Sequence, residues 1–258
     1  MAKRSTRRAQ RNAALAYAEP LDAPDNVRRL FDEPAWSPMQ AVNSAPNDSD
    51  QKYRKNIRAF NDNQQTMLDA LDRSPVVFAT GAAGTGKTYL AIAKGVEALE
   101  SGRVRRIVLS RPAVEAGESL GFLPGDMEEK LSPYLRPLYD ALCDRLSTKR
   151  LKALTAEGVI EIAPIAFMRG RTLNNAYVVI DEAQNCTYGQ LKMLLTRLGW
   201  SSTMVVTGDP EQTDLLPGMS GLGEIVDRLG GLETVETIRF DRGDVVRHPV
   251  VKEMIDLL

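Results

Sequence analysis

The sequence predicts a doubly wound α/β fold, in which a mostly parallel sheet has helices on both faces. Short apolar runs of strand length alternate along the chain with longer stretches whose apolar residues recur at helical spacing, as they do in such sheets. A glycine-rich stretch, residues 81–88, separates the first apolar run from a helix. Ligands in doubly wound folds bind at the carboxyl ends of the strands, so the polar residues that follow the runs are the functional candidates.

The predicted strands are short apolar runs, the length of parallel strands that are buried on both faces. Ordered structure is expected to begin near Tyr53, and the first strand begins at Val76. The later strands are predicted at Arg106–Ser110, Val159–Ala163, Tyr177–Ile180, Met204–Thr207 and Thr237–Phe240. Polar clusters follow three of the strands, at residues 81–88, 181–184 and 208–212.

The predicted helices are stretches whose apolar residues lie three or four positions apart. They are expected at residues 62–71, 89–101, 127–142, 191–198, 222–229 and 250–258. Glycine commonly follows the last turn of a helix, and it closes the second, fourth and fifth of these stretches. The third is predicted to be interrupted at Pro133 and Pro137, because proline removes a helical hydrogen bond.

The composition is that of a globular protein. The 258 residues, 43% of them hydrophobic, suffice for a large core, and the net charge of −1 leaves nucleic-acid contacts to local patches. Two cysteines, Cys143 and Cys186, are too few for a zinc site or a disulfide framework and suit a reducing cytoplasm. The chain has no apolar run of about 18 residues, so neither a membrane span nor a secretory signal is expected.

Residues 1–50 differ in composition from the rest of the chain. Residues 1–11 carry five basic residues and no acidic one, which suits either a nucleic-acid-binding arm or a solvated tail. Five prolines follow between Glu19 and Asp50, without sustained apolar periodicity. We therefore expect residues 1–50 to be mostly disordered and residues 51–258 to form one domain.

The glycine-rich stretch reads GAAGTGKT and matches the phosphate-binding pattern G-x-x-x-x-G-K-[ST] in full. Glycines allow backbone angles that turn successive N–H groups inward, where they hold phosphate oxygens at the start of the next helix. Lys87 is expected to reach the β- and γ-phosphates of ATP, and the Thr88 hydroxyl to bind Mg²⁺. The predicted nucleotide-binding residues are Gly81, Ala82, Ala83, Gly84, Thr85, Gly86, Lys87, Thr88 and Tyr89.

Two further polar clusters supply the side chains that hydrolysis requires. The strand predicted at Tyr177–Ile180 ends in Asp181 and Glu182. Asp181 is expected to hold Mg²⁺, and Glu182 to orient and polarise the attacking water as a general base. Residues 208–212 follow a later strand and carry Gln212, whose amide is expected to sense the γ-phosphate or the attacking water.

Several longer stretches resemble the PhoH-like ATPases, a family similar to the first motor domain of superfamily 1 helicases. The resemblance rests on FATGAAGTGKTYLA (Phe78–Ala91), LSRPAVEAGESLGFLPGD (Leu109–Asp126), FMRGRTLNNAYVVIDEAQN (Phe167–Asn185), VVTGDPEQTDL (Val205–Leu215) and DVVRHPVV (Asp244–Val251). It covers roughly residues 53–258 and implies a RecA-like fold with ATP and Mg²⁺ as ligands. It also implies that Gln64, rather than its neighbour Gln65, reads adenine; a plain solvated helix residue is the alternative for Gln64.

The same resemblance suggests that loops carrying Arg111, Arg169 and Arg171 face RNA or another single-stranded nucleic acid. Guanidinium groups suit phosphate contacts, which do not depend on base identity. Surface ion pairs are the alternative role for each of these arginines. Phe122 and Phe167 are the nearest aromatic candidates for base stacking.

The resemblance further implies assembly of several subunits. A RecA-like domain leaves its γ-phosphate exposed, and an arginine finger often supplies the missing charge in trans. Arg247 is the expected finger and Arg242 the second candidate, while His248 is expected to be structural. Repeated head-to-tail contacts close into a ring, and similarity to related motors favours six subunits. About fifty residues follow Gly208, too few for a second motor domain, so a further activity such as a nuclease would come from another chain.

Three functions remain open from the sequence. The leading one is a magnesium-dependent ATPase that couples hydrolysis to RNA or single-stranded nucleic acid as a ring. The alternative is a nucleotide-driven switch or assembly protein that remodels a protein partner. A small-molecule kinase is disfavoured, because Glu182 follows Asp181 and residues 208–212 resemble a helicase motif. Stimulation of ATP turnover by nucleic acid at several salt concentrations separates the first two.

Overall fold

The computed structural model describes residues 57–112, 127–246 and 250, with no side chains for residues 127–133. The predictions for residues 1–50 and for the last helix lie outside this part of the chain, Val250 excepted. No helix of the described residues is both long enough and apolar enough to cross a membrane.

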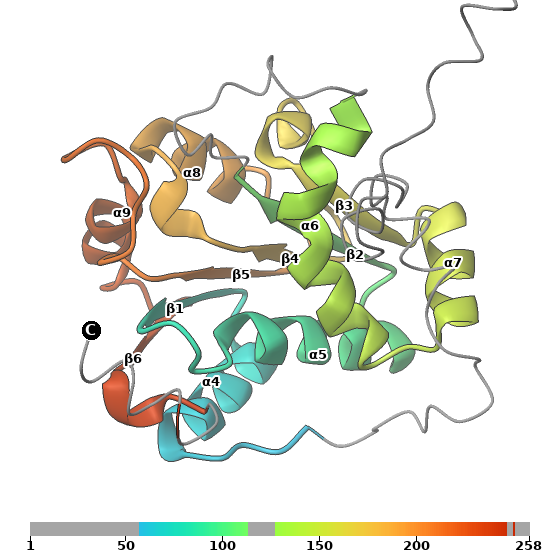
Figure 1. The fold of residues 1–258 in the computed structure, drawn as a ribbon, viewed down its shortest axis with the longest axis horizontal. Helices are drawn as coiled ribbons and strands as arrows, with labels where there is room; N and C mark the ends of the chain where they lie inside the picture. Colours follow the sequence, from blue (N-terminus) through green and yellow to red (C-terminus); the bar gives the residue numbers. More distant parts are fainter. Residues whose placement is uncertain (1–56, 113–126, 247–249, 251–258) are drawn as a thin grey trace, which may run out of the picture. The chain divides into compact units, whose positions relative to one another are not determined.

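Six parallel strands form one sheet in the order β3-β2-β4-β5-β1-β6 (Figure 1). The strands are β1 (Val76–Gly81), β2 (Arg106–Arg111), β3 (Ile160–Pro164), β4 (Ala176–Ile180), β5 (Thr203–Gly208) and β6 (Val235–Phe240). The predicted strands are thus confirmed, and the sheet has the RecA-like arrangement of P-loop NTPases, in which β5 lies between β1 and β4. The three predicted polar clusters follow the adjacent strands β4, β5 and β1, so all three lie at the carboxyl ends of the strands.

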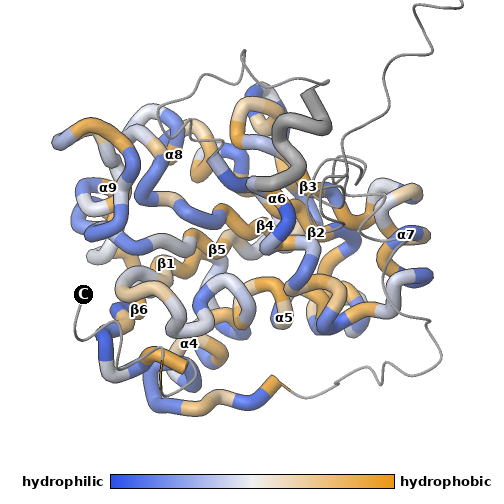
Figure 2. The backbone as a smooth tube through the Cα atoms, viewed as in Figure 1, coloured by the Kyte–Doolittle hydropathy of each residue, from blue (hydrophilic) through white to orange (hydrophobic). Residues whose placement is uncertain are grey.

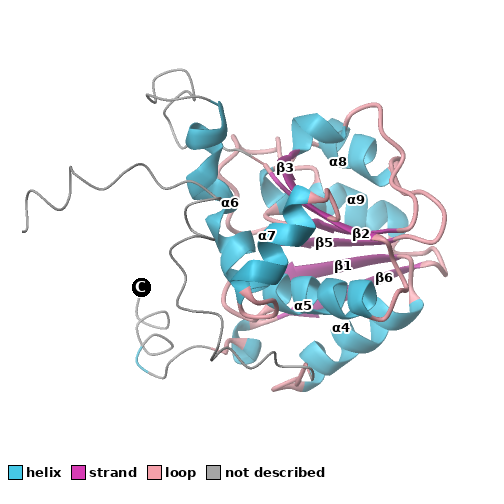
Figure 3. Ribbon diagram, turned by 90° about the vertical axis from the view of Figure 1, so that its right-hand side faces the viewer, coloured by secondary structure: helices cyan, strands magenta, loops and turns pink. Residues whose placement is uncertain are grey.

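Helices cover both faces of the sheet, as predicted. They are α4 (Asp62–Arg73), α5 (Lys87–Glu100), α6 (Met127–Cys143), α7 (Thr148–Ala156), α8 (Tyr188–Leu195) and α9 (Leu222–Leu229). Along β1, Val77 and Ala79 join the core beneath α4 to α7, while Val76 and Phe78 join the core beneath α8 and α9. Successive residues of a strand point to opposite faces, so one strand helps to build both cores. Figure 3 shows the helices that cover the two faces of the sheet.

The prediction that prolines interrupt the third helix was wrong. Helix α6 runs continuously from Met127 to Cys143 and includes Pro133 and Pro137. Its second half buries Leu138 and Leu142 completely in the core that also contains α5. A proline in a helix interior loses one hydrogen bond and clashes with the carbonyl four residues before it, at a cost of about 3 kcal/mol. Burial of large side chains, each worth about 1.5–3 kcal/mol, offsets such a local cost.

Two other helices differ from the prediction. Helix α7 was not expected, although Ser147 is a recognisable N-cap whose hydroxyl accepts a hydrogen bond from the Arg150 amide at 3.3 Å. Helix α8 was expected to continue to Leu198 but ends at Leu195. Leu198 instead forms a β-bridge with Leu173, so a contact distant in sequence ends this helix early.

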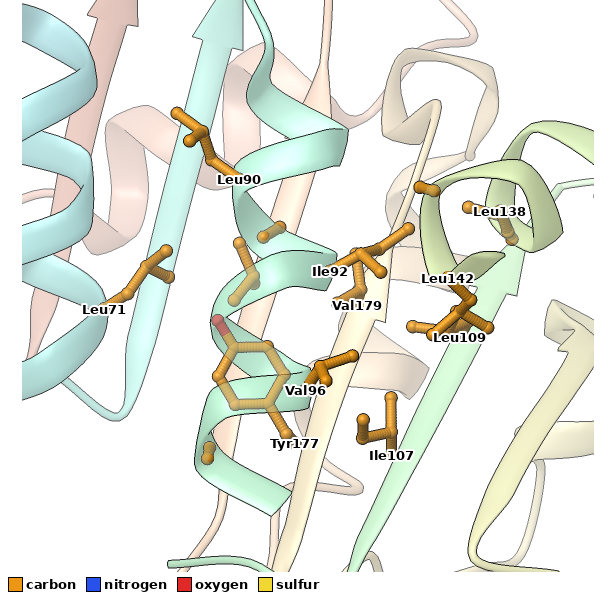
Figure 4. Close-up of a cluster of buried hydrophobic side chains, with 14 of the residues drawn as sticks. Leu71, Leu90, Ile92, Val96, Ile107, Leu109, Leu138, Leu142, Tyr177 and Val179 are labelled. Atoms are coloured by element: carbon orange, nitrogen blue, oxygen red, sulfur yellow. The ribbon is translucent and has the colours of Figure 1, made fainter. Parts of the chain in front are cut away.

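The packing of α5 on the sheet sets the position of the residues that precede it. The Tyr177 ring of β4 lies against α5 beside Val96 (Figure 4), and a Cβ atom on Gly95 would approach this ring to 2.8 Å. Only glycine therefore allows this close approach. Figure 2 shows that the central strands β4 and β5 are largely hydrophobic, as a core buried on both faces requires. Helix α5 packs on this core, with its N-terminus at the carboxyl end of β1.

Both cysteines are free. Cys186 is buried in the core beneath α8 and α9, and burial raises the pKa of its thiol to about 12. Because the thiolate is the reactive form, Cys186 is a packing residue.

Candidate functional site

The loop between β1 and α5 depends on three glycines. Gly81 has a φ of 119°, and a Cβ atom there would lie 1.9 Å from the carbonyl oxygen of Phe240 in β6. Gly84 and Gly86 have φ values of 80° and 85°, in the left-handed region that side chains disfavour. The loop conformation thus needs glycine at Gly81 and Gly86, which the pattern specifies, and also at Gly84. The loop leads directly into the N-terminus of α5.

Lys87, the first residue of α5, bends back over this loop. Its Nζ atom donates hydrogen bonds to the carbonyl oxygens of Gly81 at 2.6 Å and Ala82 at 2.7 Å, and to Thr85 Oγ1 at 3.3 Å. All three partners are uncharged, so none of these contacts neutralises the ammonium group. A buried cation at a helix N-terminus is suited to an anionic ligand such as a phosphate.

The surroundings of Lys87 also call for a metal ion if a phosphate chain is to bind. Burial lowers the pKa of Lys87, while the negative charges of Asp209, Glu182 and Asp181 act in the opposite direction. These three carboxylates would repel phosphates unless a divalent cation lay between them. The charges of the site therefore suit a phosphate chain that binds together with a divalent cation.

Asp181 follows β4 and is buried between two hydroxyl groups. Its Oδ1 atom accepts hydrogen bonds from Thr88 Oγ1 at 2.6 Å and from Thr207 Oγ1 at 2.8 Å. These side chains come from α5 and β5 respectively, so three elements meet at this carboxylate. A hydroxyl and a carboxylate oxygen in contact are the hard ligands that Mg²⁺ prefers, and Thr88 and Asp181 are the predicted pair.

Glu182 has an unusual backbone conformation for a residue with a side chain, with φ 52° and ψ 43°. Such conformations cost about 1–3 kcal/mol and cluster at functional sites. The side chain is 36% exposed, so water reaches it. Its Oε2 atom accepts a hydrogen bond from Gln184 Nε2 at 2.6 Å, and its Oε1 atom accepts one from Arg111 at 3.3 Å.

Gln184 joins the carboxylate to the loop after β5, a role that the sequence analysis missed. Its Nε2 atom also donates to the carbonyl oxygen of Gln212 at 3.2 Å, and its Oε1 atom accepts from the Asp209 amide at 3.0 Å. A Cβ atom on Gly208 would lie 2.7 Å from that Oε1 atom, so glycine at this position leaves room for the Gln184 amide. The sequence signal was present, because Gln184 is the last residue of the polar cluster that begins at Asp181.

These residues surround a cavity of about 280 Å³ at the carboxyl edge of the sheet. Its lining comes from the loop after β1, the end of β4 and the loop after β5: Ala83, Gly84, Gly86, Lys87, Thr88, Tyr89, Asp181, Glu182, Gly208, Asp209 and Gln212. The structure therefore brings together most of the nucleotide-binding, metal-binding and catalytic residues predicted from the sequence.

Comparison with known proteins assigns the family. Residues 56–258 match the family model described as PhoH-like protein. The chain belongs to this family. It is 54% identical over 203 residues to the PhoH-like protein of Bacillus subtilis (strain 168), a match that covers 78% of this chain and 64% of that protein. It is 48% identical over 194 residues to Protein PhoH of Escherichia coli (strain K12), a match that covers 74% of this chain and 55% of that protein.

The PhoH-like chain thus spans less than two thirds of the length of these relatives. Solved structures are more distant. The large terminase of a thermophilic bacteriophage aligns with a TM-score of 0.47 and 12% identity, over 77% of this chain and 50% of that one. The Pif1 helicase of Candida albicans aligns with a TM-score of 0.41 and 13% identity, over 78% and 43%. These likenesses are too remote to bear on function.

Gln64, the residue that the PhoH resemblance implies for adenine, lies 2% exposed at the start of α4. Its Nε2 atom donates to the carbonyl oxygen of Thr85 at 2.9 Å, and its Oε1 atom accepts from the Phe60 amide at 2.8 Å. The Gln64 amide group therefore holds the loop between β1 and α5 through the Thr85 carbonyl. Adenine recognition by Gln64 stays a prediction.

The three arginines expected to face nucleic acid have different surroundings. Arg111 reaches into the site, as described above. Arg171 forms a bidentate ion pair with Glu161, with N–O distances of 2.5 and 2.6 Å, and this pair raises the pKa of Arg171. Arg169 is exposed beyond the carboxyl end of β3, and Phe167 nearby is 60% exposed. Phe122 lies outside the described residues.

The segment that follows β6 returns to the phosphate-binding loop. The Val246 amide donates to the carbonyl oxygen of Gly84 at 3.0 Å, and Asn63 of α4 donates to Asp244 Oδ2 at 2.7 Å. Arg242 lies in the short 3₁₀ helix Arg242–Asp244, which lines a neighbouring pocket. Arg247 and His248 fall outside the part of the chain that the structure describes.

Proposed function

We propose that this PhoH-like chain binds and hydrolyses ATP with Mg²⁺ and couples the reaction to RNA or another single-stranded nucleic acid. The observation that carries the first half is the contact between Thr88 Oγ1 and Asp181 Oδ1, in the cavity that Lys87 and Glu182 also line. Phosphate-binding, metal-binding and water-activating groups thus line one cavity.

The chain's own residues divide the work of hydrolysis. The N–H groups at the start of α5, together with Lys87, hold the β- and γ-phosphates. Thr88 and Asp181 would hold Mg²⁺, which supplies neutralising charge for the phosphoryl group in transfer. Glu182 accepts the proton of the attacking water. Gln184 orients the Glu182 carboxylate and also donates to the backbone carbonyl oxygen of Gln212.

The proposed nucleic-acid surface lies at the carboxyl end of β3, the strand that neighbours β2. Arg169 supplies a cation there, and Phe167 supplies an exposed ring on which a base can stack. Phosphate contacts of this kind bind without regard to base sequence and weaken as salt is added. The alternative, remodelling of a protein partner, requires no such salt dependence.

Replacing Arg169 with alanine is expected to weaken RNA binding across sequences and to reduce the slope of log affinity against log salt by about one. Turnover of ATP without RNA should be preserved. The measurement is a filter-binding titration of single-stranded RNA at several salt concentrations, together with RNA-stimulated phosphate release. Arg105→Ala is the matched control, since Arg105 is exposed just before β2, at the amino ends of the strands. Equal affinities for the two variants would favour the protein-partner alternative.

The proposed assembly is a homo-oligomeric ring, probed through Arg247. Mixing Arg247→Ala protein with Lys87→Ala protein is expected to restore part of the turnover that each lacks alone. One subunit keeps the arginine and the other keeps the phosphate-binding loop, so a mixed interface unites the two if the arginine acts in trans. Phosphate release is measured against mixing ratio at constant total protein.

The control mixture is Lys87→Ala protein with Glu182→Gln protein. Each of these substitutions disables the ATP site of the chain that carries it. No mixed interface of that pair contains a complete site, so no recovery is expected. Val246 contacts Gly84 of its own chain, which makes action in cis the competing arrangement. A monomeric mass with ATP bound, and no recovery in the mixture of Arg247→Ala with Lys87→Ala, would exclude the ring.

A further inference from the structure

Arg111 lies where the predicted nucleic-acid arginines and the hydrolysis site meet. It is the last residue of β2, and the Asp181 amide donates to the carbonyl oxygen of Ser110 at 2.8 Å, which aligns the ends of β2 and β4. The guanidinium group then reaches Glu182 Oε1 at 3.3 Å and Asp181 Oδ2 at 3.7 Å. The Arg111 side chain is 21% exposed, so an external ligand can reach it.

The Arg111 contact affects the oxygen atoms that a general base needs. Gln184 donates to Glu182 Oε2 and Arg111 donates to Glu182 Oε1, so both carboxylate oxygens already accept a hydrogen bond. Gln184 lies two residues away and orients Glu182 locally, whereas Arg111 holds it from another strand. An oxygen that accepts from a guanidinium group is less available to a water molecule, because donor and water compete for its lone pairs.

The Arg111 contact is also looser than a comparable ion pair in the same protein. Arg171 grips Glu161 through two hydrogen bonds at 2.5 and 2.6 Å. Within the described part of the chain, Arg111 makes one hydrogen bond, to Glu182. A guanidinium group has five N–H donors, so a second anion can engage Arg111 at little cost.

The position of β2 in the sheet places Arg111 beside the surface where such an anion would bind. Strand β2 lies between β4 and β3, and Arg111 pairs in register with Pro164 at the end of β3. Phe167 and Arg169 of the proposed nucleic-acid surface follow Pro164 by three and five positions along the chain. A nucleic-acid strand on that surface therefore brings phosphates next to the residue that holds Glu182.

We propose that Arg111 is a positioning residue that restrains Glu182, and that a nucleic-acid phosphate frees Glu182 by taking Arg111 as its partner. This inference rests on the proposed function, with Glu182 as the base. The nucleic-acid surface and the hydrolysis site would then be coupled by a change of partner, in which the Arg111 guanidinium group leaves the Glu182 carboxylate and binds a phosphate. Arg111 contributes no bond to the reacting atoms and acts through Glu182.

Replacing Arg111 with alanine is expected to raise ATP turnover without RNA by about three- to tenfold, the scale of one released hydrogen bond. Affinity for ATP should change little, so the effect lies in kcat rather than in KM. Stimulation by a single-stranded RNA oligonucleotide of mixed sequence should largely disappear, because the restraint that RNA relieves is already gone. Arg111→Lys, which keeps a charged donor, should restore part of the stimulation. Arg106→Ala, at the other end of β2, is the matched control.

A double-variant cycle determines whether Arg111 acts through Glu182. In the Glu182→Gln background, Arg111→Ala should leave the slow single-turnover rate unchanged, since no base remains to be freed. The same gain in both backgrounds, a fall in kcat for Arg111→Ala, or retained RNA stimulation would each overturn the restraint. A different result contradicts the proposed function: an unaltered rate of ATP turnover in Glu182→Gln alone, which would also remove the base that Arg111 restrains.

Discussion

Lys87→Ala protein is expected to lose ATP turnover almost completely and to bind ATP far more weakly than the unaltered chain. Lys87 Nζ is the buried cation of the phosphate-binding loop, and its described hydrogen-bond partners are two carbonyl groups and a hydroxyl group. Alanine removes the charge and leaves Asp209, Glu182 and Asp181 facing the phosphates. A charge-assisted contact to each of two phosphates is lost, which corresponds to about 10²-fold or more in affinity.

Binding of a fluorescent ATP analogue and phosphate release together measure this effect. Lys94→Ala is the matched control, because Lys94 is a second buried lysine on α5. Its Nζ atom pairs with Asp72 at 2.7 Å and Glu97 at 3.3 Å, so it neutralises carboxylates of its own chain. We expect Lys94→Ala to lower stability and to leave ATP affinity close to normal. Equal loss of ATP affinity in both variants would mean that Lys87 acts through the stability of α5 and not through phosphate.

Glu182→Gln protein is expected to bind ATP normally and to hydrolyse it about 10²-fold or more slowly, the scale of a lost general base. Glutamine has nearly the same shape as glutamate, but its single amide oxygen can replace only one of the two carboxylate oxygens that accept from Gln184 and Arg111. It has no carboxylate to take a proton from water. Binding and chemistry therefore separate at this residue, whereas they fail together at Lys87.

Single-turnover phosphate release with prebound ATP tests the role of Glu182 directly. Glu211→Gln is the control, since Glu211 is an exposed acid on the loop after β5 and does not line the 280 Å³ cavity. We expect this control to leave the rate within about twofold, as surface changes of small energy do. An unaltered rate in Glu182→Gln would remove the carboxylate assignment and the proposal for Arg111 with it.

Prediction from the sequence succeeded where the signal is local. Apolar runs bounded by polar or glycine residues located all six strands, because strand length and burial are written into consecutive residues. The stretch Gly81–Thr88 and the pair Asp181-Glu182 were found for the same reason, as each is contiguous in the chain. The predictions failed where distant contacts decide the outcome, as in α6, which packs on α5 and runs through two prolines.

The sequence by itself determined the family, the fold class and the order of the strands, and it predicted the candidate site residues that are contiguous in the chain. Only the tertiary structure decided which side chains act on one another across the sheet. Arg111 precedes Glu182 by 71 positions, and the two meet because β2 pairs with β4 and aligns the strand ends. Gln64 supports Thr85 for a similar reason, through packing of α4 beside the loop. Such contacts follow from strand order and helix packing, which no short stretch of residues encodes.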